Sequence, residues 1–150
     1  MEEKKFMLML DKVFLDTNIL VYLANEDSPF HHKVVTRFKK LAGECELWIS
    51  RQVLSEYAVV MTRTGTVEKP LSPSEVAADI EQWEGIFQIA DETEEVTRIL
   101  VELIKEYDIK GKSIHDANII ATMTANLIET LFTFNTDDFK EFDSVELIGA

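Results

Sequence analysis

Short apolar runs alternate along this chain with longer stretches in which apolar residues recur at helical spacing. This alternation predicts βαβ units, in which strands lie parallel in one sheet and helices cover the faces of the sheet. The apolar runs place strands at about 13–15, 47–49, 86–89, 131–134 and 145–148. The helical pattern covers about 19–24, 31–43, 51–63, 73–84, 92–107 and 113–126.

Capping residues predict where several of these helices begin. Ser72 and Glu75 have the spacing of a capping box, and Pro73 stands at the first helical position between them. Ser50 and Asp91 each precede a helical stretch and can accept a hydrogen bond from its first turn. We therefore expect helices to start directly after these residues.

Composition and length are those of a globular protein. The chain has 150 residues, of which 46% are hydrophobic and 29% charged, so we expect residues 1–150 to form one α/β domain. The single cysteine, Cys45, excludes an internal disulfide and favours a reducing cytoplasm. No apolar run approaches the roughly 20 residues of a membrane-spanning helix. The apolar patch at 6–10 is too short for a signal peptide.

Charge is spread unevenly along the chain. The formal net charge is −13, and residues 70–150 carry five basic and 18 acidic side chains. An acidic protein binds nucleic acid poorly unless it has a local basic surface. Such a surface is available in 31–69, where basic residues outnumber acidic ones by seven to four. The candidates for phosphate binding are Lys33, Arg37, Lys40, Arg51 and Arg63, although a solvated helix face explains the stripe at 33–40 equally well.

Asp16 is the first candidate for chemistry. It follows the apolar run Val-Phe-Leu and precedes Thr17 and Asn18, so it stands at the carboxyl end of the first predicted strand. Ligands of open parallel sheets bind at this end, where the strand order reverses. The alternative is that Asp16 only caps the helix that follows it.

Glu56 and Asp116 are acids on the apolar faces of two predicted helices. Glu56 shares its face with Val53 and Val60, and a carboxylate there is costly unless it is paired or binds a metal. Asp116 lies on the face of Ile119. Two structural explanations stay open: the Glu56 carboxylate can reach water along its stem, and Asp116 can close a capping box.

A fourth polar cluster follows the strand expected at 131–134. It contains Thr133, Asn135, Asp137 and Asp138, which a polar turn would also favour. In a parallel sheet, this cluster and Asp16 would lie at the same edge. Carboxylates that meet there without lysine or arginine repel one another, and a hard cation relieves that repulsion. Oxygen ligands favour Mg²⁺ or Mn²⁺ over zinc.

The four clusters in this order resemble the PIN-domain nucleases, and among them the VapC-type toxin ribonucleases. The motifs that carry the resemblance are Val-Phe-Leu-Asp16-Thr17-Asn18, Glu56, His-Asp116-Ala-Asn-Ile-Ile-Ala and Thr133-Phe-Asn135-Thr-Asp137-Asp138-Phe. The resemblance implies a three-layer α/β/α sandwich with strand order 3-2-1-4-5. It also implies cleavage of RNA phosphodiester bonds that depends on Mg²⁺ or Mn²⁺.

The resemblance also implies roles for individual residues. It makes Asp16, Glu56, Asp116 and Asp138 the metal-binding catalytic acids, with Thr17, Asn18, Thr133, Asn135 and Asp137 as auxiliary residues. A VapC-like protein would pair with a small antitoxin protein and form a homodimer. Two other functions stay open: a PIN-like interaction module that no longer cuts, and a haloacid-dehalogenase-like phosphatase. The phosphatase would need a second aspartate where Asn18 stands.

Overall fold

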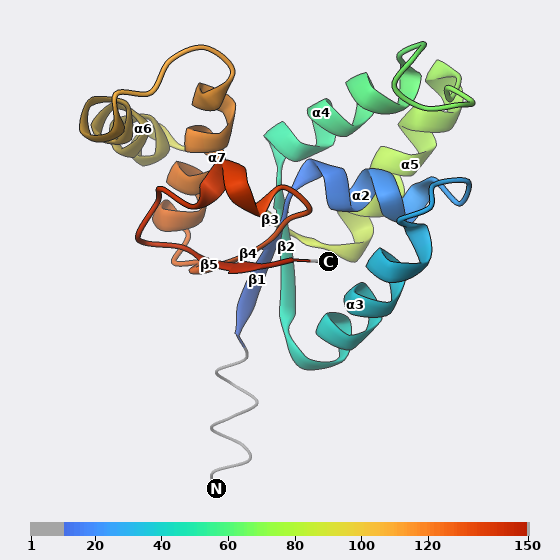
Figure 1. Cartoon of the computed structure of the whole chain (residues 1–150), viewed down its shortest axis with the longest axis horizontal. Coiled ribbons are helices and arrows are strands. Elements are labelled where there is room, and N and C mark those ends of the chain that lie inside the picture. The colour runs from blue at the N-terminus through green and yellow to red at the C-terminus, as the bar shows by residue number, and fades with distance from the viewer. Residues whose placement is uncertain (1–10, 150) are drawn as a thin grey trace, which may run out of the picture.

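Five parallel strands form the centre of the computed structural model, which describes residues 11–149 (Figure 1). The order across the sheet is β3-β2-β1-β4-β5, so the order implied by the resemblance is confirmed. The strands are β1 (Lys12–Leu15), β2 (Glu46–Ser50), β3 (Gln88–Ala90), β4 (Thr130–Phe132) and β5 (Glu146–Ile148). Every neighbouring pair is parallel, as the alternating sequence pattern predicts.

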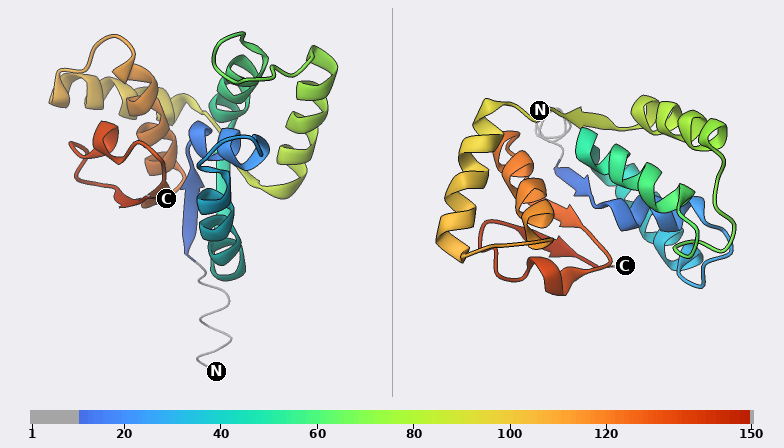
Figure 2. Two further views of the ribbon diagram at one scale, coloured as in Figure 1. Left: turned by 45° about the vertical axis from the view of Figure 1, so that its right-hand side comes forward. Right: turned by 90° about the horizontal axis from the view of Figure 1, so that it is seen from above.

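Helices cover both faces of this sheet, which confirms the three-layer arrangement. The helices are α2 (Thr17–Ala24), α3 (His31–Glu44), α4 (Arg51–Thr62), α5 (Pro73–Ile86), α6 (Glu94–Tyr107) and α7 (Ser113–Ala125), with a short 3-10 helix η1 (Thr136–Phe139). Helices α2 to α5 lie on one side and α6 with α7 on the other (Figures 1 and 2). The chain changes sides between β3 and β4, because β4 pairs with β1 on the edge away from β2.

The point of reversal between β1 and β4 is where the sheet can open to a ligand. Below it, both strands are anchored in the core. Phe14, Leu15, Leu131 and Phe132 have no exposed surface. The first polar residues after the two strands, Asp16 and Thr133, are therefore held in fixed positions at the same edge of the sheet.

Two helix starts agree with the sequence prediction. Ser72 and Glu75 form the expected reciprocal capping box at the start of α5, with proline in the first turn. The Ser50 hydroxyl accepts a hydrogen bond from the Val53 amide and so caps α4. The α4 cap matters for function, because it fixes where Glu56 stands relative to the sheet edge.

Three boundaries differ from the prediction. Helix α5 continues to Ile86, so β3 begins at Gln88 rather than at residue 86. Asp91 does not cap a helix, since α6 begins at Glu94 after Thr93. Strand β4 ends at Phe132, because the next residues turn toward α2: Thr133 binds Asp16 and the Phe134 amide binds Asn18.

No helix in residues 11–149 is long and apolar enough to cross a membrane. The apolar patch at 6–10, which the sequence analysis considered as a signal peptide, lies outside the described residues.

Candidate active site

Asp16 is a buried carboxylate at the junction of β1 and α2. Its side chain is only 7% exposed, and its two oxygens accept hydrogen bonds from the Thr17 amide at 2.8 Å and the Thr133 hydroxyl at 2.8 Å. The side-chain amide of Asn18 also donates a hydrogen bond to the Asp16 carboxylate, at 3.4 Å. Asp16 is therefore the N-cap of α2, as the simpler alternative held, and three neighbours also fix its orientation.

The charge on Asp16 is unfavourable in this environment. Burial raises its pKa to about 6, and the hydrogen bonds from Thr133 and Thr17 offset only part of that effect. The carboxylates of Glu56 and Asp138 raise it further, which places both acids in the electrostatic neighbourhood of Asp16.

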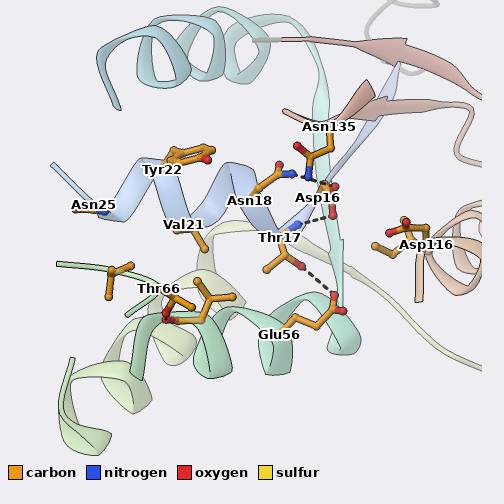
Figure 3. Close-up of a pocket in the computed structure, with 13 residues that line it drawn as sticks. Asp16, Thr17, Asn18, Val21, Tyr22, Asn25, Glu56, Thr66, Asp116 and Asn135 are labelled. Atoms are coloured by element: carbon orange, nitrogen blue, oxygen red, sulfur yellow. Dashed lines mark hydrogen bonds between the residues drawn. The ribbon is translucent and has the colours of Figure 1, made fainter. Parts of the chain in front are cut away.

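Glu56 reaches the same place from helix α4. Its Oε1 atom accepts a hydrogen bond from the Thr17 hydroxyl at 3.0 Å. Thr17 therefore connects Asp16, through its backbone amide, to Glu56, through its side chain. The half-buried Glu56 carboxylate does not simply extend along the helix into water; it is held toward the end of β1 (Figure 3).

Asp116 approaches from the opposite layer, on the first turn of α7. The capping-box alternative is wrong: Ser113 is already helical, the N-cap is Lys112, and no side chain caps this helix. Burial raises the pKa of Asp116 to about 7, and the carboxylates of Asp16, Asp138 and Glu56 contribute further. Asp116 therefore belongs electrostatically to the same group of acids.

The segment after β4 contributes unequally. The Thr133 hydroxyl donates a hydrogen bond to Asp16 and accepts one from the backbone amide of Asn135 at 3.0 Å. Asn135 and Asp138 are both exposed; Asn135 lines the cavity described below, whereas Asp138 on η1 does not and acts on the other acids through its charge. Asp137 is exposed and forms an ion pair with Lys140 at 2.5 Å, which lowers its pKa.

These groups surround one cavity of about 360 Å³. Asp16, Glu56 and Asp116 line it from β1, α4 and α7, that is, from the sheet edge and from both helical layers (Figure 3). Other polar and aromatic residues that line the cavity are Thr17, Asn18, Tyr22, Asn25, Thr66 and Asn135. Three carboxylates that are far apart in sequence thus share one opening.

The carboxylate oxygens that line the cavity suit a hard dication, although they do not converge on one metal position. Within residues 11–149, no three carboxylate, imidazole or thiol groups are already gathered as a metal-binding group. The ion pairs of that range join Arg51 to Glu84, Arg98 to Glu94 and Lys140 to Asp137, so none neutralises the cavity acids. Mutual repulsion separates such carboxylates, and a cation that prefers oxygen ligands would draw them together.

A hydrogen-bond network that was not predicted from the sequence joins helix α4 of one layer to helix α7 of the other. Asn118 on α7 donates to Gln52 on α4 at 2.6 Å and to Glu92 at 2.8 Å. The Glu92 carboxylate also accepts a hydrogen bond from the backbone amide of Gln52 at 3.0 Å. This network fixes the distance between α4, which carries Glu56, and α7, which carries Asp116. Only the polarity of Asn118 beside an apolar helix face could have indicated it.

The predicted basic residues are dispersed. Lys33, Arg37 and Lys40 are exposed on α3, and Arg51 forms an ion pair with Glu84. Arg63 alone among the five lines a cleft that adjoins the cavity. The sequence analysis missed Lys112 and His115, which line the same cleft.

Comparisons with known proteins bear on the family and the fold of this chain. The PIN domain family model matches residues 13–145. The chain is 26% identical over 138 residues to Ribonuclease VapC48 of Mycobacterium tuberculosis, a match that covers 88% of this chain and 92% of the relative.

Solved structures share the fold. One is VapBC2 from Rickettsia felis bound to a DNA fragment from its promoter, with a TM-score of 0.70, 23% identity, and coverage of 93% of this chain and 98% of that one. Another is VapC20 from Mycobacterium tuberculosis, a toxin that cleaves the sarcin-ricin loop, with a TM-score of 0.65, 20% identity, and coverage of 87% and 95%. Since the family model spans most of the sequence, this chain belongs to the PIN domain family.

Proposed function

We propose that this protein is an endoribonuclease that hydrolyses RNA phosphodiester bonds and requires Mg²⁺ or Mn²⁺. The carrying observation is that Asp16, Glu56 and Asp116 line one cavity without a cationic partner among the described residues. The ribonuclease name of the relative VapC48 supports this choice of substrate. We also propose that residues 1–150 act as one PIN domain.

In this proposal, Asp16, Glu56 and Asp116 hold the metal, with Asp138 as the fourth acid and Asn135 as an additional oxygen donor. A bound Mg²⁺ or Mn²⁺ would supply positive charge to the phosphate oxygens and would make a water molecule more acidic. The Asp16 carboxylate has a fixed orientation, because the Thr133 hydroxyl and the Thr17 backbone amide donate hydrogen bonds to its two oxygens. Asp137 is a weaker candidate, since Lys140 already pairs with it.

The remaining residues position the acids. The Thr17 hydroxyl aims Glu56 at the cavity, and the Asn118–Gln52–Glu92 network holds α4 against α7. Asn18 joins two elements: its amide donates to Asp16, and its oxygen accepts from the Phe134 backbone. This bridging role differs from that of the second acid that a haloacid-dehalogenase-like phosphatase would need at position 18.

We further propose that a small antitoxin protein covers this site and that the chain forms a homodimer. Support comes from the solved neighbours, several of which are toxin–antitoxin complexes, including one from Klebsiella pneumoniae. We propose a cytoplasmic location, which agrees with an RNA substrate and with the single free cysteine, Cys45.

The rival function is a PIN-like interaction module that does not cut RNA. The net charge of −13 favours this rival, because an acidic surface repels RNA. The three acids that line the cavity speak against it, since a module that only binds a partner has no need of repelling carboxylates in a shared opening.

Cleavage of labelled RNA by the purified chain tests the proposal. We expect cleavage with Mg²⁺ or Mn²⁺, none with excess EDTA, and a strong loss in Asp16→Asn and Asp116→Asn. The matched control is Asp91→Asn, which changes an exposed acid on the loop before α6 and should cut normally. Cleavage that persists in EDTA, or in both cavity variants, would refute the metal mechanism. Absence of both cleavage and Mn²⁺ binding would refute the proposed function and favour the rival.

A further inference from the structure

A second cleft, of about 560 Å³, opens beside the acidic cavity between α4 and the start of α7. The two hollows adjoin, because Glu56, Val60 and Asp116 line both of them. Away from these shared residues, the lining changes from acidic to basic: Arg63, Lys112 and His115 stand there. The candidate catalytic acids therefore have a group of cationic and hydrogen-bonding side chains directly beside them.

The basic side chains of this cleft are available to a ligand. Arg63 follows the last residue of α4 and Lys112 precedes the first residue of α7, and both are exposed. Neither takes part in the ion pairs found within residues 11–149. Arg51 is different, because Glu84 already neutralises it.

The position of His115 is fixed by its backbone. Its carbonyl oxygen accepts a hydrogen bond from the Gln52 side chain at 3.0 Å, which holds the first turn of α7 against α4. The His115 ring is exposed and lies one residue before Asp116. It is therefore placed to donate a hydrogen bond to a group that lies next to the acidic cavity.

We propose that this cleft binds the RNA phosphates next to the scissile phosphate, with Arg63 and Lys112 as their ion-pair partners and His115 as a hydrogen-bond donor. The inference rests on the proposed ribonuclease function and adds the direction in which the RNA leaves the acids. A strongly acidic protein needs such a local basic surface, since its overall charge repels the substrate. The half-exposed Val59, which also lines the cleft, gives an apolar surface against which a ribose or base can lie.

The salt dependence of RNA binding measures these phosphate contacts. Each contact with a single strand contributes about 0.7 to the slope of log affinity against log salt. The double variant Arg63→Gln/Lys112→Gln should therefore lower the slope by about 1.4, which is about 25-fold in affinity at roughly 0.1 M salt. The matched control, Arg98→Gln/Lys105→Gln, removes one arginine and one lysine charge from exposed positions on α6 and should change the slope little.

The experiment uses the full chain and a short unstructured fluorescent RNA. Anisotropy in EDTA gives affinity without cleavage, and steady-state cleavage with Mn²⁺ gives kcat and KM. The cleft variant should weaken binding and raise KM while kcat changes little, because neither residue touches the reacting group. Circular dichroism and the melting midpoint should match those of the wild type, since both positions are exposed.

Two results separate the failure of this inference from the failure of the proposed function. If the wild type cuts RNA but the cleft variant keeps its affinity and KM, or the α6 control variant loses as much, the cleft is not the phosphate site. If the wild type neither binds nor cuts RNA, the proposed function fails and the inference fails with it.

Discussion

Removing the charge of Asp16 should stabilise the metal-free protein at neutral and alkaline pH. Burial raises the pKa of Asp16 from 3.8 to about 6, so the folded state disfavours its carboxylate. One pKa unit corresponds to about 1.4 kcal/mol, so the ionised Asp16 costs about 3 kcal/mol of folding stability. Replacing the carboxylate by an amide reverses the hydrogen bond with Thr133, at a cost of about 1 kcal/mol. Asp16→Asn should therefore gain about 2 kcal/mol.

The sign of this effect depends on pH. Below pH 3.8 Asp16 is protonated in both the folded and the unfolded chain, so the penalty is absent. It develops as the pH rises from 3.8 to about 6 and is complete above that. The gain of Asp16→Asn should follow the same course, present at pH 8 and lost near pH 4.

Urea unfolding in EDTA, followed by tryptophan fluorescence, measures this gain. The control is Asp137→Asn, which should not stabilise, because Lys140 lowers the pKa of Asp137. Adding Mn²⁺ should stabilise the wild type more than Asp16→Asn, since only the wild type keeps the full set of acids. An Asp16→Asn protein that is less stable than the wild type in EDTA at pH 8, or equally affected at both pH values, would refute the reasoning.

Three further predictions concern the support of the acids. Thr17→Val removes the hydroxyl that holds Glu56 and should lower cleavage about tenfold with the fold intact, as checked by initial rates and circular dichroism; full activity would show that Glu56 needs no such support. Ser50→Ala removes the α4 cap and should cost about 1 kcal/mol in a urea melt, whereas an unchanged free energy would place the stability of α4 in packing alone. The Mn²⁺ affinity, measured by calorimetry, should rise between pH 6 and pH 8. Burial and neighbouring acids raise the pKa of Asp116 to about 7, and its proton must leave before the carboxylate can bind a metal. A constant affinity would count against Asp116 as a ligand.

The order of helices and strands could be read from the sequence because apolar spacing and capping residues agreed. Ser72, Pro73 and Glu75 marked the start of α5, and the structure shows the full capping box. The end of that helix was not readable, because three of the four residues at 86–89 are apolar and suggested a strand. Ile86 is 61% exposed at the end of α5, so the side chain that suggested a strand does not enter the core.

The three acids of the cavity were predictable because strand ends and helix faces constrain them. Asp16 follows three buried residues of β1, and Glu56 was predicted from the helix face that it shares with Val53, which the structure buries. The choice between Asn135 and Asp138 was not readable: both are exposed, and the structure places Asn135 but not Asp138 in the cavity lining. The turn after β4 decides which of the two lines the cavity, and spacing alone does not determine that turn.

The residues that were missed depend on how the helical layers meet. The contacts of Asn118 with Gln52 and Glu92 join segments that are 66 and 26 positions apart. Lys112 and His115 line a cleft only because α7 starts beside α4. The cleft leaves no local pattern in the sequence, and the network leaves only a polar residue, Asn118, beside an apolar helix face, since both arise from the packing of elements on the two sides of the sheet edge.

A crystal structure of the wild-type protein with Mn²⁺, using the anomalous scattering of the metal, tests the role of the cavity acids most directly. We predict a manganese peak in the cavity, bonded to oxygens of Asp16 and Asp116 with Glu56 turned toward it, and no such peak in Asp16→Asn. A peak bound elsewhere, or a cavity that stays metal-free at saturating Mn²⁺, would contradict the claim that these acids form a metal-dependent catalytic centre.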